Sequence, residues 1–593
     1  MLYIWFLYLY IVSVFGQTDF NHEVFLDSKE NLQLLWRIEE DTIVFEVRAN
    51  TTGYVGIGFS SNGGMKGADI MIGWVNNGTP YISDRHGIGN VEPEIDNQGD
   101  YELLYGNETN GLTIIGYQRK LLTCDKDDYD ITSDTVRVIW SYHPEDPEDM
   151  KATYHGPQQR GVRSIIFLDI RPSNLKSLPE DVKAFDILNN NTLVPSDRAT
   201  TYWCTHIELP ALLTPHHIIR IEPIIQPGNE GVVHHLVLRL CYGLQNIIGS
   251  NSLNCEINLM YQFRFCSKTM YAWAAGGGAL DFPEHVGFRI GVDDVRYLQL
   301  TVHYDNLQLI KGIHDSSGVR IYYTPELRKY DSSILTIGIP SFRLYVIPPK
   351  ENAFKVYGSC DKQCSNKILT EGDMKVFSVL LHAHLAGTSM RLTHFRNGEY
   401  IGEIARDRAY DFNLQEERKL KNQWIVKPGD DLFLECTYNT MDRETVTYGG
   451  PATTDEMCLA FLSYYPKANA GICYNTPNPI NLENLLNLGD IKNNTLRQAI
   501  DGMEWTDERK DAVRQWYKTS RLGKCTNHSV HSVFPEYTLL PGYSEYVETE
   551  SLEYLINLQS QIVEHDKCSA AVNLKAALLS AVTCVIAVTL FSI

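Results

Sequence analysis

The sequence predicts a mainly β protein made of successive β-sandwich domains, with one short helical segment near residues 481–520. Three observations predict this class. Short runs rich in β-branched and aromatic residues recur along the chain and are separated by turn residues. The chain has 593 residues, which is too long for one core and suggests about three or four domains. Helical periodicity is confined to the 481–520 region.

The composition, 44% hydrophobic and 21% charged, is ordinary for globular domains. The formal net charge is −21, whereas a nucleic-acid-binding surface needs a basic stripe. The acidic balance therefore disfavours a nucleic-acid partner and is compatible with a cationic small molecule.

The N-terminal segment, the cysteines and the glycosylation sequons predict a secretory route. Residues 1–16 form a short apolar segment that ends in small residues, as in a cleaved signal peptide. Twelve cysteines remain when Cys584 in the apolar tail is set aside, which allows up to six disulfides in an oxidising compartment. Glycosylation sequons agree with this route and begin at Asn50, Asn77, Asn107, Asn190, Asn493 and Asn527.

The C-terminal segment 569–593 predicts membrane attachment. Its last 18 residues carry no charge, which is about the minimum length for a span. A transmembrane helix and a cleaved lipid-anchor signal, with small residues at Ser569, Ala570 and Ala571, both fit. We expect a membrane-attached protein of the endoplasmic reticulum, secretory vesicles or the cell surface, with its domains on the lumenal or extracellular side.

The first domain is predicted over residues 17–146. Strands are expected at 32–38, 42–48, 54–59 and 136–140, a close spacing typical of a β-sandwich. Asp69, Asp84 and Asp100 are expected in polar loops and could bind a hard cation, although turn and cap roles are the commoner explanation for each. The charged, proline-bearing stretch 147–161 reads as a linker.

Two further strand-rich domains are predicted at 162–345 and 346–525, followed by a polar stem at 526–568. The second domain has expected strands at 218–225, 232–240 and 297–304. The third has them at 376–385 and 431–436, and it contains the helical segment.

The strand at 376–385 contains His382-Ala383-His384. Side chains alternate along a strand, so both imidazoles are expected on one face, with Leu381, Ala383 and Leu385 on the other. Two imidazoles on an apolar strand suit half of a metal site. An incidental pair of histidines is the alternative.

Three other places carry candidate ligands. His234 and His235 are neighbours in a strand, so both could face one metal only if the strand has a bulge or a strong twist. His303 lies on the polar face of the strand at 297–304. Met457 would ordinarily fill a core, but beside His382 and His384 its soft thioether would favour copper, especially Cu(I), over zinc.

The candidate ligands follow one another along the chain as His-His, His, His-x-His and Met. With this order the chain resembles the copper type II, ascorbate-dependent monooxygenases, and within them the dopamine-β-hydroxylase-like branch. The motifs, spread over nearly the whole chain, are Thr123-Cys124-Asp125, Thr201-Tyr202-Trp203-Cys204, His234-His235, Val302-His303-Tyr304, His382-Ala383-His384-Leu385-Ala386-Gly387 and Glu456-Met457-Cys458. The resemblance implies an N-terminal DOMON β-sandwich followed by two jelly-roll-like copper domains.

The resemblance also implies roles for individual residues. His234, His235 and His303 would hold a copper that stores and passes an electron, and His382, His384 and Met457 a second copper that activates O2. Tyr202 and His382 match active-site positions. Two ascorbates would each supply one electron, and the products would be a hydroxylated carbon and water.

By the same resemblance, the disulfides are Cys204–Cys255, Cys241–Cys266, Cys360–Cys473, Cys364–Cys525, Cys436–Cys458 and Cys124–Cys568. A cation site in the related DOMON domain matches Asp69 and Asp100, with the carbonyls of Ile70 and Arg85. A homo-oligomer is compatible with the family.

The residue at position 380 bears on the substrate. Peptide-amidating relatives have an arginine two residues before His-x-His, where this chain has Leu380, so a small apolar or aromatic substrate, such as an arylethylamine hydroxylated at its β-carbon, is expected. Ala383 also resembles the monooxygenase-like branch. One alternative is a non-catalytic, membrane-attached DOMON ligand-binding protein. Another, a zinc hydrolase, lacks a His-Glu-x-x-His helix.

Overall fold

The computed structural model describes residues 20–540, except 28, 169–177, 180, 211, 242–251, 256–265, 267, 275–276, 292–296, 307, 340–344, 371, 451, 469–470, 478–481, 483–485, 487–495, 520 and 527–537. The described chain is mainly β, which confirms the predicted fold class. The predicted signal peptide, the C-terminal anchor and the residues Cys568, Asn493 and Asn527 lie outside the described residues. No described helix is long and apolar enough to cross a membrane.

The first domain is a sandwich of two antiparallel sheets. One has the order β1-β2-β3-β9-β8 and the other β11-β10-β4-β5-β6-β7. The aromatic rings of Phe45, Phe59, Tyr117 and Phe167 meet in its core. The strands are β1 His22–Phe25, β2 Leu32–Glu39, β3 Thr42–Ala49, β4 Val55–Ser60, β5 Asp69–Asn76, β6 Thr79–His86, β7 Glu94–Ile95, β8 Glu102–Thr109, β9 Leu112–Lys120, β10 Val136–Tyr142 and β11 Arg160–Ile165.

This sandwich extends past the predicted boundary at residue 146. Strand β11 pairs with β10 from Val136↔Ile165 to Ser141↔Arg160, so the last residues of the expected linker belong to a sheet. Phe167 then packs against Trp36, and its carbonyl accepts the Trp36 indole N–H at 3.1 Å. Proline and charge mark the turn at 144–149 but do not reveal that the chain returns to the same sheet.

The second domain is also built from two main sheets, with orders β12-β23-β15-β20-β24, to which β19 adds through β15, and β17-β14-β21-β16-β18. Strands β13 and β22 pair with each other and form a small two-stranded ribbon. The strands are β12 Lys183–Leu188, β13 Thr192–Leu193, β14 Thr200–Glu208, β15 His216–Ile224, β16 Val233–Cys241, β17 Ser252–Asn254, β18 Lys268–Ala274, β19 Leu280–Asp281, β20 Val286–Ile290, β21 Tyr297–Asp305, β22 His314–Asp315, β23 Gly318–Thr324 and β24 Tyr330–Asp331.

The third domain has sheets of order β31-β28-β34-β25-β35-β36-β37 and β27-β32-β29-β30, with a ribbon of β26 and β33. Because β25 belongs here, this domain begins near residue 333 and not at 346. The strands are β25 Ser333–Ile339, β26 Val346–Ile347, β27 Phe354–Cys360, β28 Met374–His382, β29 Gly387–Arg396, β30 Glu399–Asp407, β31 Arg418–Val426, β32 Asp430–Tyr438, β33 Thr447–Tyr448, β34 Cys458–Tyr465, β35 Ile472–Pro477, β36 Arg521–Thr526 and β37 Thr538–Leu540.

Helices are few. Helices α4 (Leu496–Asp501) and α5 (Asp507–Thr519) lie in the predicted helical segment, and the buried Trp516 and Tyr517 attach α5 to the core. Helix α2 (Lys362–Ile368) was not predicted from periodicity because it spans only two turns. Its start is nevertheless marked by Asp361, whose side chain accepts the Cys364 N–H at 2.8 Å as an N-cap.

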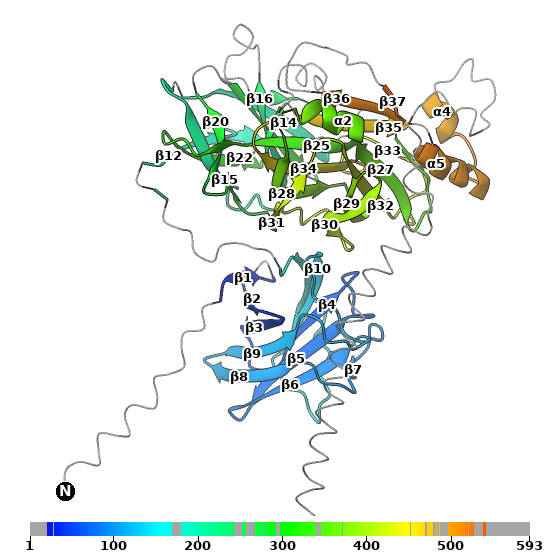
Figure 1. Cartoon of the computed structure of the whole chain (residues 1–593). Helices are drawn as coiled ribbons and strands as arrows, with labels where there is room; N and C mark the ends of the chain where they lie inside the picture. The colour runs from blue at the N-terminus through cyan, green and yellow to red at the C-terminus, as the bar shows by residue number, and fades with distance from the viewer. Residues whose placement is uncertain are drawn as a thin grey trace, which may run out of the picture.

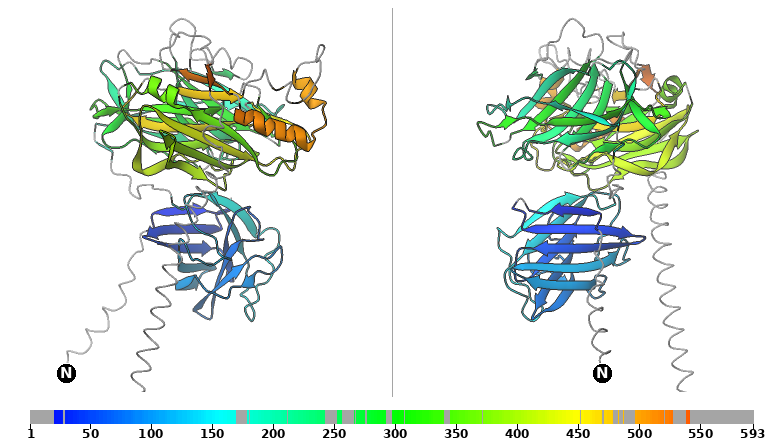
Figure 2. Two further views of the ribbon diagram at one scale, coloured as in Figure 1. Left: turned by 45° about the vertical axis from the view of Figure 1, so that its right-hand side comes forward. Right: turned by 90° about the vertical axis from the view of Figure 1, so that its left-hand side faces the viewer.

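The second and third domains lie side by side, and the first sandwich lies against them at one end (Figure 1). The two further views in Figure 2 show the same arrangement. The cores of the second and third domains meet, because Phe377 and Tyr465 of the third domain pack into the core of the second.

Candidate metal centre

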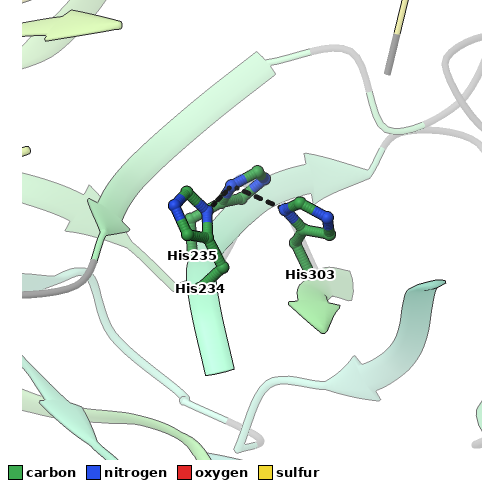
Figure 3. Close-up of side chains that lie close together, drawn as sticks. All are labelled: His234, His235 and His303. Carbon is green, nitrogen blue, oxygen red and sulfur yellow. Dashed lines mark hydrogen bonds between the residues drawn. The ribbon is translucent and has the colours of Figure 1, made fainter. Parts of the chain in front are cut away.

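Three histidines of the second domain meet at one point on neighbouring strands. His234 and His235 lie on β16 and His303 lies on β21 (Figure 3). The register between these strands shifts between Val233 and His235, so His234 is an extra residue in the ladder. This is the bulge that two adjacent ligands require, and it lets both imidazoles point toward His303.

The nitrogen positions suit a metal ion. Nδ1 of His235 lies 3.1 Å from Nδ1 of His234 and 3.2 Å from Nδ1 of His303. Three nitrogens bound at about 2.0 Å to one metal would be separated by about 3.3 Å. Neutral imidazoles could not satisfy all three nitrogens through these mutual contacts alone.

Burial keeps these imidazoles neutral, as a metal ligand must be. Burial, followed by the proximity of His382, lowers the pKa of His234 to about 3. Burial and the neighbouring imidazoles hold the pKa values of His235 and His303 well below the usual range.

Tyr202, the predicted active-site tyrosine, lies beside this trio. It is on β14, directly opposite His303 in the register. The two rings are stacked, with centroids 4.4 Å apart and an interplanar angle of 3°. Tyr202 therefore fixes the plane of the His303 ring.

The second candidate set lies at the end of β28. The strand ends at His382, so His384 is in the following turn and not on the strand face that alternation predicts. Leu385, expected on the buried face, is 45% exposed for the same reason. The rings of His382 and His384 still converge, with centroids 5.2 Å apart and planes at 87°.

Gly387 allows this turn to close. Its N–H donates to the His384 carbonyl at 3.0 Å, and a Cβ on Gly387 would lie 2.8 Å from the Cβ of Ala383. A larger residue at this position would therefore crowd Ala383, which lies between the two histidines.

One nitrogen of each imidazole in this second set already has a partner. Nδ1 of His382 lies 2.6 Å from the Gln415 side-chain oxygen, and Nδ1 of His384 lies 3.1 Å from the Asp455 carbonyl. These contacts fix Nδ1–H and leave Nε2 with a lone pair, as in metal-bound histidines. Burial lowers the pKa of His382 and holds that of His384 well below its usual range.

Met457 is placed by its neighbours. Strand β34 pairs with β28 up to His382↔Leu459, so Met457, two residues before Leu459, lies on the His384 side. The buried Glu456 carboxylate accepts N–H groups from His384 at 2.8 Å and Met457 at 3.3 Å, which ties the two residues together. The Cys436–Cys458 disulfide holds the adjacent position.

Copper fits the residues that are present. Within the described part of the chain, Nε2 of His384 is buried without a hydrogen-bond partner, and an ion bound to its lone pair would satisfy this nitrogen. Imidazoles with a half-buried thioether nearby form a donor set that suits copper rather than Mg²⁺ or Ca²⁺.

The two sets face each other across the contact between the second and third domains. The rings of His235 and His382 have centroids 5.7 Å apart. Phe412 lies between the sets, stacked on His234 at 3.8 Å and edge-on to His384 at 5.9 Å.

The acidic cluster of the first domain differs from the predicted one. The structure groups Asp69, Asp84 and Asp128, whose ligand atoms lie within 4.8 Å of one another. Asp69 and Asp84 lie on strands β5 and β6 and not in loops. Asp100 is adjacent, because its N–H donates to Asp84 at 2.7 Å. Ile70 pairs with Arg85 in the same sheet.

Four of the six disulfides that the resemblance implies are present: Cys204–Cys255, Cys241–Cys266, Cys360–Cys473 and Cys436–Cys458. Cys124 and Cys364 are also disulfide-bonded, while Cys568 and the side chain of Cys525 lie outside what the structure describes. The sequon residues Asn50, Asn77, Asn107 and Asn190 are exposed.

Several residues at the site carry no sequence signal. Phe412 and Gln415 come from the segment after β30, which has no metal-ligand pattern. Asp128 is one of several acids in the 125–130 stretch, and only the fold selects it. Glu456 belongs to the motif Glu456-Met457-Cys458, but the motif alone does not show that its carboxylate accepts the N–H of His384.

Comparisons with known proteins agree with this geometry. Residues 28–143 match the DOMON domain family, 185–311 the N-terminal and 330–486 the C-terminal domain of copper type II ascorbate-dependent monooxygenase. DBH-like monooxygenase protein 1 of Homo sapiens is 40% identical over 468 residues, covering 78% of this chain and 76% of that protein.

The corresponding protein of Mus musculus is 39% identical over 465 residues, covering 77% of this chain and 75% of that protein. Dopamine beta-hydroxylase of Canis lupus familiaris is 34% identical over 475 residues, covering 79% and 75%. These matches take in all three domains, which argues against the non-catalytic alternative. The chain therefore belongs to the copper type II, ascorbate-dependent monooxygenases, and it is an oxidoreductase that uses copper and ascorbate.

Proposed function

We propose that this enzyme hydroxylates a C–H bond of a small aromatic amine, with the β-carbon of an arylethylamine as the target. The balanced reaction consumes one substrate, one O2 and two ascorbates. It yields the alcohol, water and two monodehydroascorbate radicals. The observation that carries the proposal is the pair of buried histidine sets that meet at the contact between the second and third domains, where the rings of His235 and His382 lie 5.7 Å apart.

Each residue has a role in this proposal. His234, His235 and His303 would hold one copper, and His382, His384 and Met457 would hold the other. Copper supplies one-electron chemistry with O2 when bound. The chain contributes neutral ligands, the Gln415 and Asp455 contacts that orient two imidazoles, and the Tyr202 ring that orients His303.

The surroundings of the second set favour an apolar substrate. Leu380 is 5% exposed and pairs with Phe461 in the sheet. The ring of Phe461 lies 6.5 Å from that of His382. Leu380 offers no cation for a substrate carboxylate, so a peptide with a free C-terminus is disfavoured at this position. Apolar side chains near His382 are instead suited to an aromatic ring.

Copper analysis and a substrate panel test this proposal. We expect about two copper ions per purified full-length chain, and ascorbate-dependent O2 uptake with phenylethylamine, tyramine or dopamine that exceeds uptake with a glycine-extended peptide. Product analysis should place oxygen at the β-carbon. Zinc in place of copper would contradict the ligand assignment, whereas faster turnover of the peptide would contradict the substrate.

The same chemistry agrees with a secretory location. The disulfides and the exposed sequon residues support synthesis in an oxidising, glycosylating compartment. Membrane attachment through residues 569–593 and assembly into a homo-oligomer belong to the proposal and can be checked by carbonate extraction and light scattering.

The first domain is proposed to bind a hard cation at Asp69, Asp84 and Asp128. Oδ1 of Asp84 is buried and has no hydrogen-bond partner among the described residues. Arg119 already pairs with Asp69 and lies 3.8 Å from Asp128, so one positive charge offsets part of the cluster. Oxygen ligands at this spacing favour Ca²⁺.

Cation binding should depend on pH in a defined direction. Burial, with smaller contributions from neighbouring carboxylates, raises the pKa of Asp84 to about 8 and that of Asp128 to about 7. The folded state therefore retains protons that the unfolded state loses near its ordinary pKa of about 4. Without a cation, stability should fall as the pH rises from about 4 to about 8.

Calcium should counteract this loss, because a cation competes with those protons. We expect Ca²⁺ to raise the unfolding temperature of the first domain more at about pH 8 than at about pH 6. Asp84→Asn should abolish the difference, while Asp27→Asn, a turn-forming aspartate of the same domain, should keep it. An equal calcium effect at both pH values would contradict the site.

A further inference from the structure

Residues 407–415, which we call the bridge segment, join the first domain to both candidate copper sets. The segment begins at the end of β30 and lies between the first sandwich and the histidines. Some of its side chains face the first sandwich and others face the histidines. Asp411, Asn413 and Leu414 line a cavity of about 910 Å³ beside the first sandwich. Those that contact the histidines or the chain between them are Tyr410, Phe412 and Gln415.

The first domain holds the start of the segment through buried polar contacts. Thr135 donates its N–H at 3.0 Å and its hydroxyl at 2.7 Å to the Asp407 carboxylate, which is fully buried. Asp134 accepts the backbone N–H of Arg408 at 2.9 Å and its Nε–H at 2.7 Å. Four hydrogen bonds thus fix two consecutive residues of the segment to one strand end.

Arg137 holds the middle of the segment. Its guanidinium donates to the Ala409 carbonyl at 2.9 Å and to the Tyr410 carbonyl at 3.0 Å. Ser164 of β11 donates to the Asp411 carboxylate. The cavity borders this side of the segment, so these directed contacts are what hold it against the first domain there.

The far side of the segment touches the candidate ligands. The Tyr410 hydroxyl donates to the Ala383 carbonyl at 2.7 Å and accepts the Ala383 N–H at 2.9 Å, which fixes the residue between His382 and His384. The Phe412 carbonyl lies 3.3 Å from His234 Nε2, and its ring stacks on the same imidazole. Gln415 reaches His382 and also donates to the Phe412 carbonyl at 2.8 Å.

We propose that the first domain acts as a positioning device for the copper centres, and that it does so through the bridge segment. Arg137, Thr135 and Asp134 are positioning residues, since they touch no copper ligand. They hold Phe412 and Gln415, which orient His234 and His382 on opposite sides of the interdomain contact. The inference rests on the proposed copper ligands and adds a role for the DOMON domain in the hydroxylation.

Arg137→Ala in the full-length chain tests this proposal. We expect the copper content to stay at two ions per chain and the Cu(II) hyperfine pattern in the electron paramagnetic resonance spectrum to change. We expect kcat to fall by about 10-fold, because Arg137 acts through Phe412 and Gln415, and outer partners of metal ligands have effects of about 10- to 100-fold. KM for the amine should stay the same. Arg163→Ala is the matched control: Arg163 lines the same cavity, but its guanidinium donates to the Phe25 carbonyl of its own domain.

A second variant tests the contact between the bridge segment and His234. Phe412→Leu alters no contact between the first domain and the segment, yet it removes the stacking on His234, so it should change the spectrum in the same way. A wild-type spectrum and kcat in Arg137→Ala would overturn the inference, whatever the result for Phe412→Leu. A wild-type chain that binds no copper would instead overturn the ligand assignment and, with it, this inference.

Discussion

Met457→Ile is expected to abolish hydroxylation while the fold is kept. Isoleucine is close to methionine in volume, and Met457 is only half-buried, so the packing cost should be below about 1.5 kcal/mol. The thioether, however, is the one soft donor proposed for the second copper. We expect kcat to fall by about 100-fold or more, since even outer partners of metal ligands are worth 10- to 100-fold, and copper to fall toward about one ion per chain.

Met374→Ile is the matched control for that experiment. Met374 is buried at the start of β28 in the same domain, and its side chain belongs to the core. This variant should lose some stability but keep both coppers and its turnover. Hydroxylation by Met457→Ile at the wild-type rate would refute the assignment of Met457 as a ligand.

The sequence predicts the parts of this site that follow from strand periodicity. Alternation places His303 on the polar face of its strand, and β21 contains it as expected. Adjacent histidines at 234 and 235 require a bulge if they share a metal, and the register shift in β16 provides one. Both inferences use only the two-residue repeat of a strand.

Other features depend on where the chain ends a strand or returns in space. His384 lies beyond the end of β28, because the Glu456 carboxylate accepts the N–H groups of His384 and Ala386. No local sequence pattern predicts these hydrogen bonds. Strand β11 joins the first sandwich after a charged turn. The bridge segment contacts residues 272 positions away in the sequence, such as Thr135 with Asp407, and a single sequence has no signal for such pairs.

Glu456→Ala is expected to destabilise the third domain and loosen the second copper set. The Glu456 carboxylate is fully buried and accepts N–H groups from His384 at 2.8 Å, Ala386 at 2.6 Å and Met457 at 3.3 Å. Its loss leaves these three donors without the acceptor in a dry environment, which should cost about 3–5 kcal/mol. Unfolding of the third domain in calorimetry should shift down by about 10 °C.

The same substitution separates a structural role from a role at the copper set. Because Glu456 ties His384 to Met457, its loss should weaken copper binding at this set and leave the His234, His235 and His303 set unchanged. Asp455→Ala is the matched control: it removes a neighbouring carboxylate but keeps the backbone carbonyl that lies 3.1 Å from His384 Nδ1. If Glu456→Ala and Asp455→Ala unfold at the same temperature and bind copper equally, the Glu456 carboxylate does not organise this turn, and the Cys436–Cys458 disulfide becomes the better candidate.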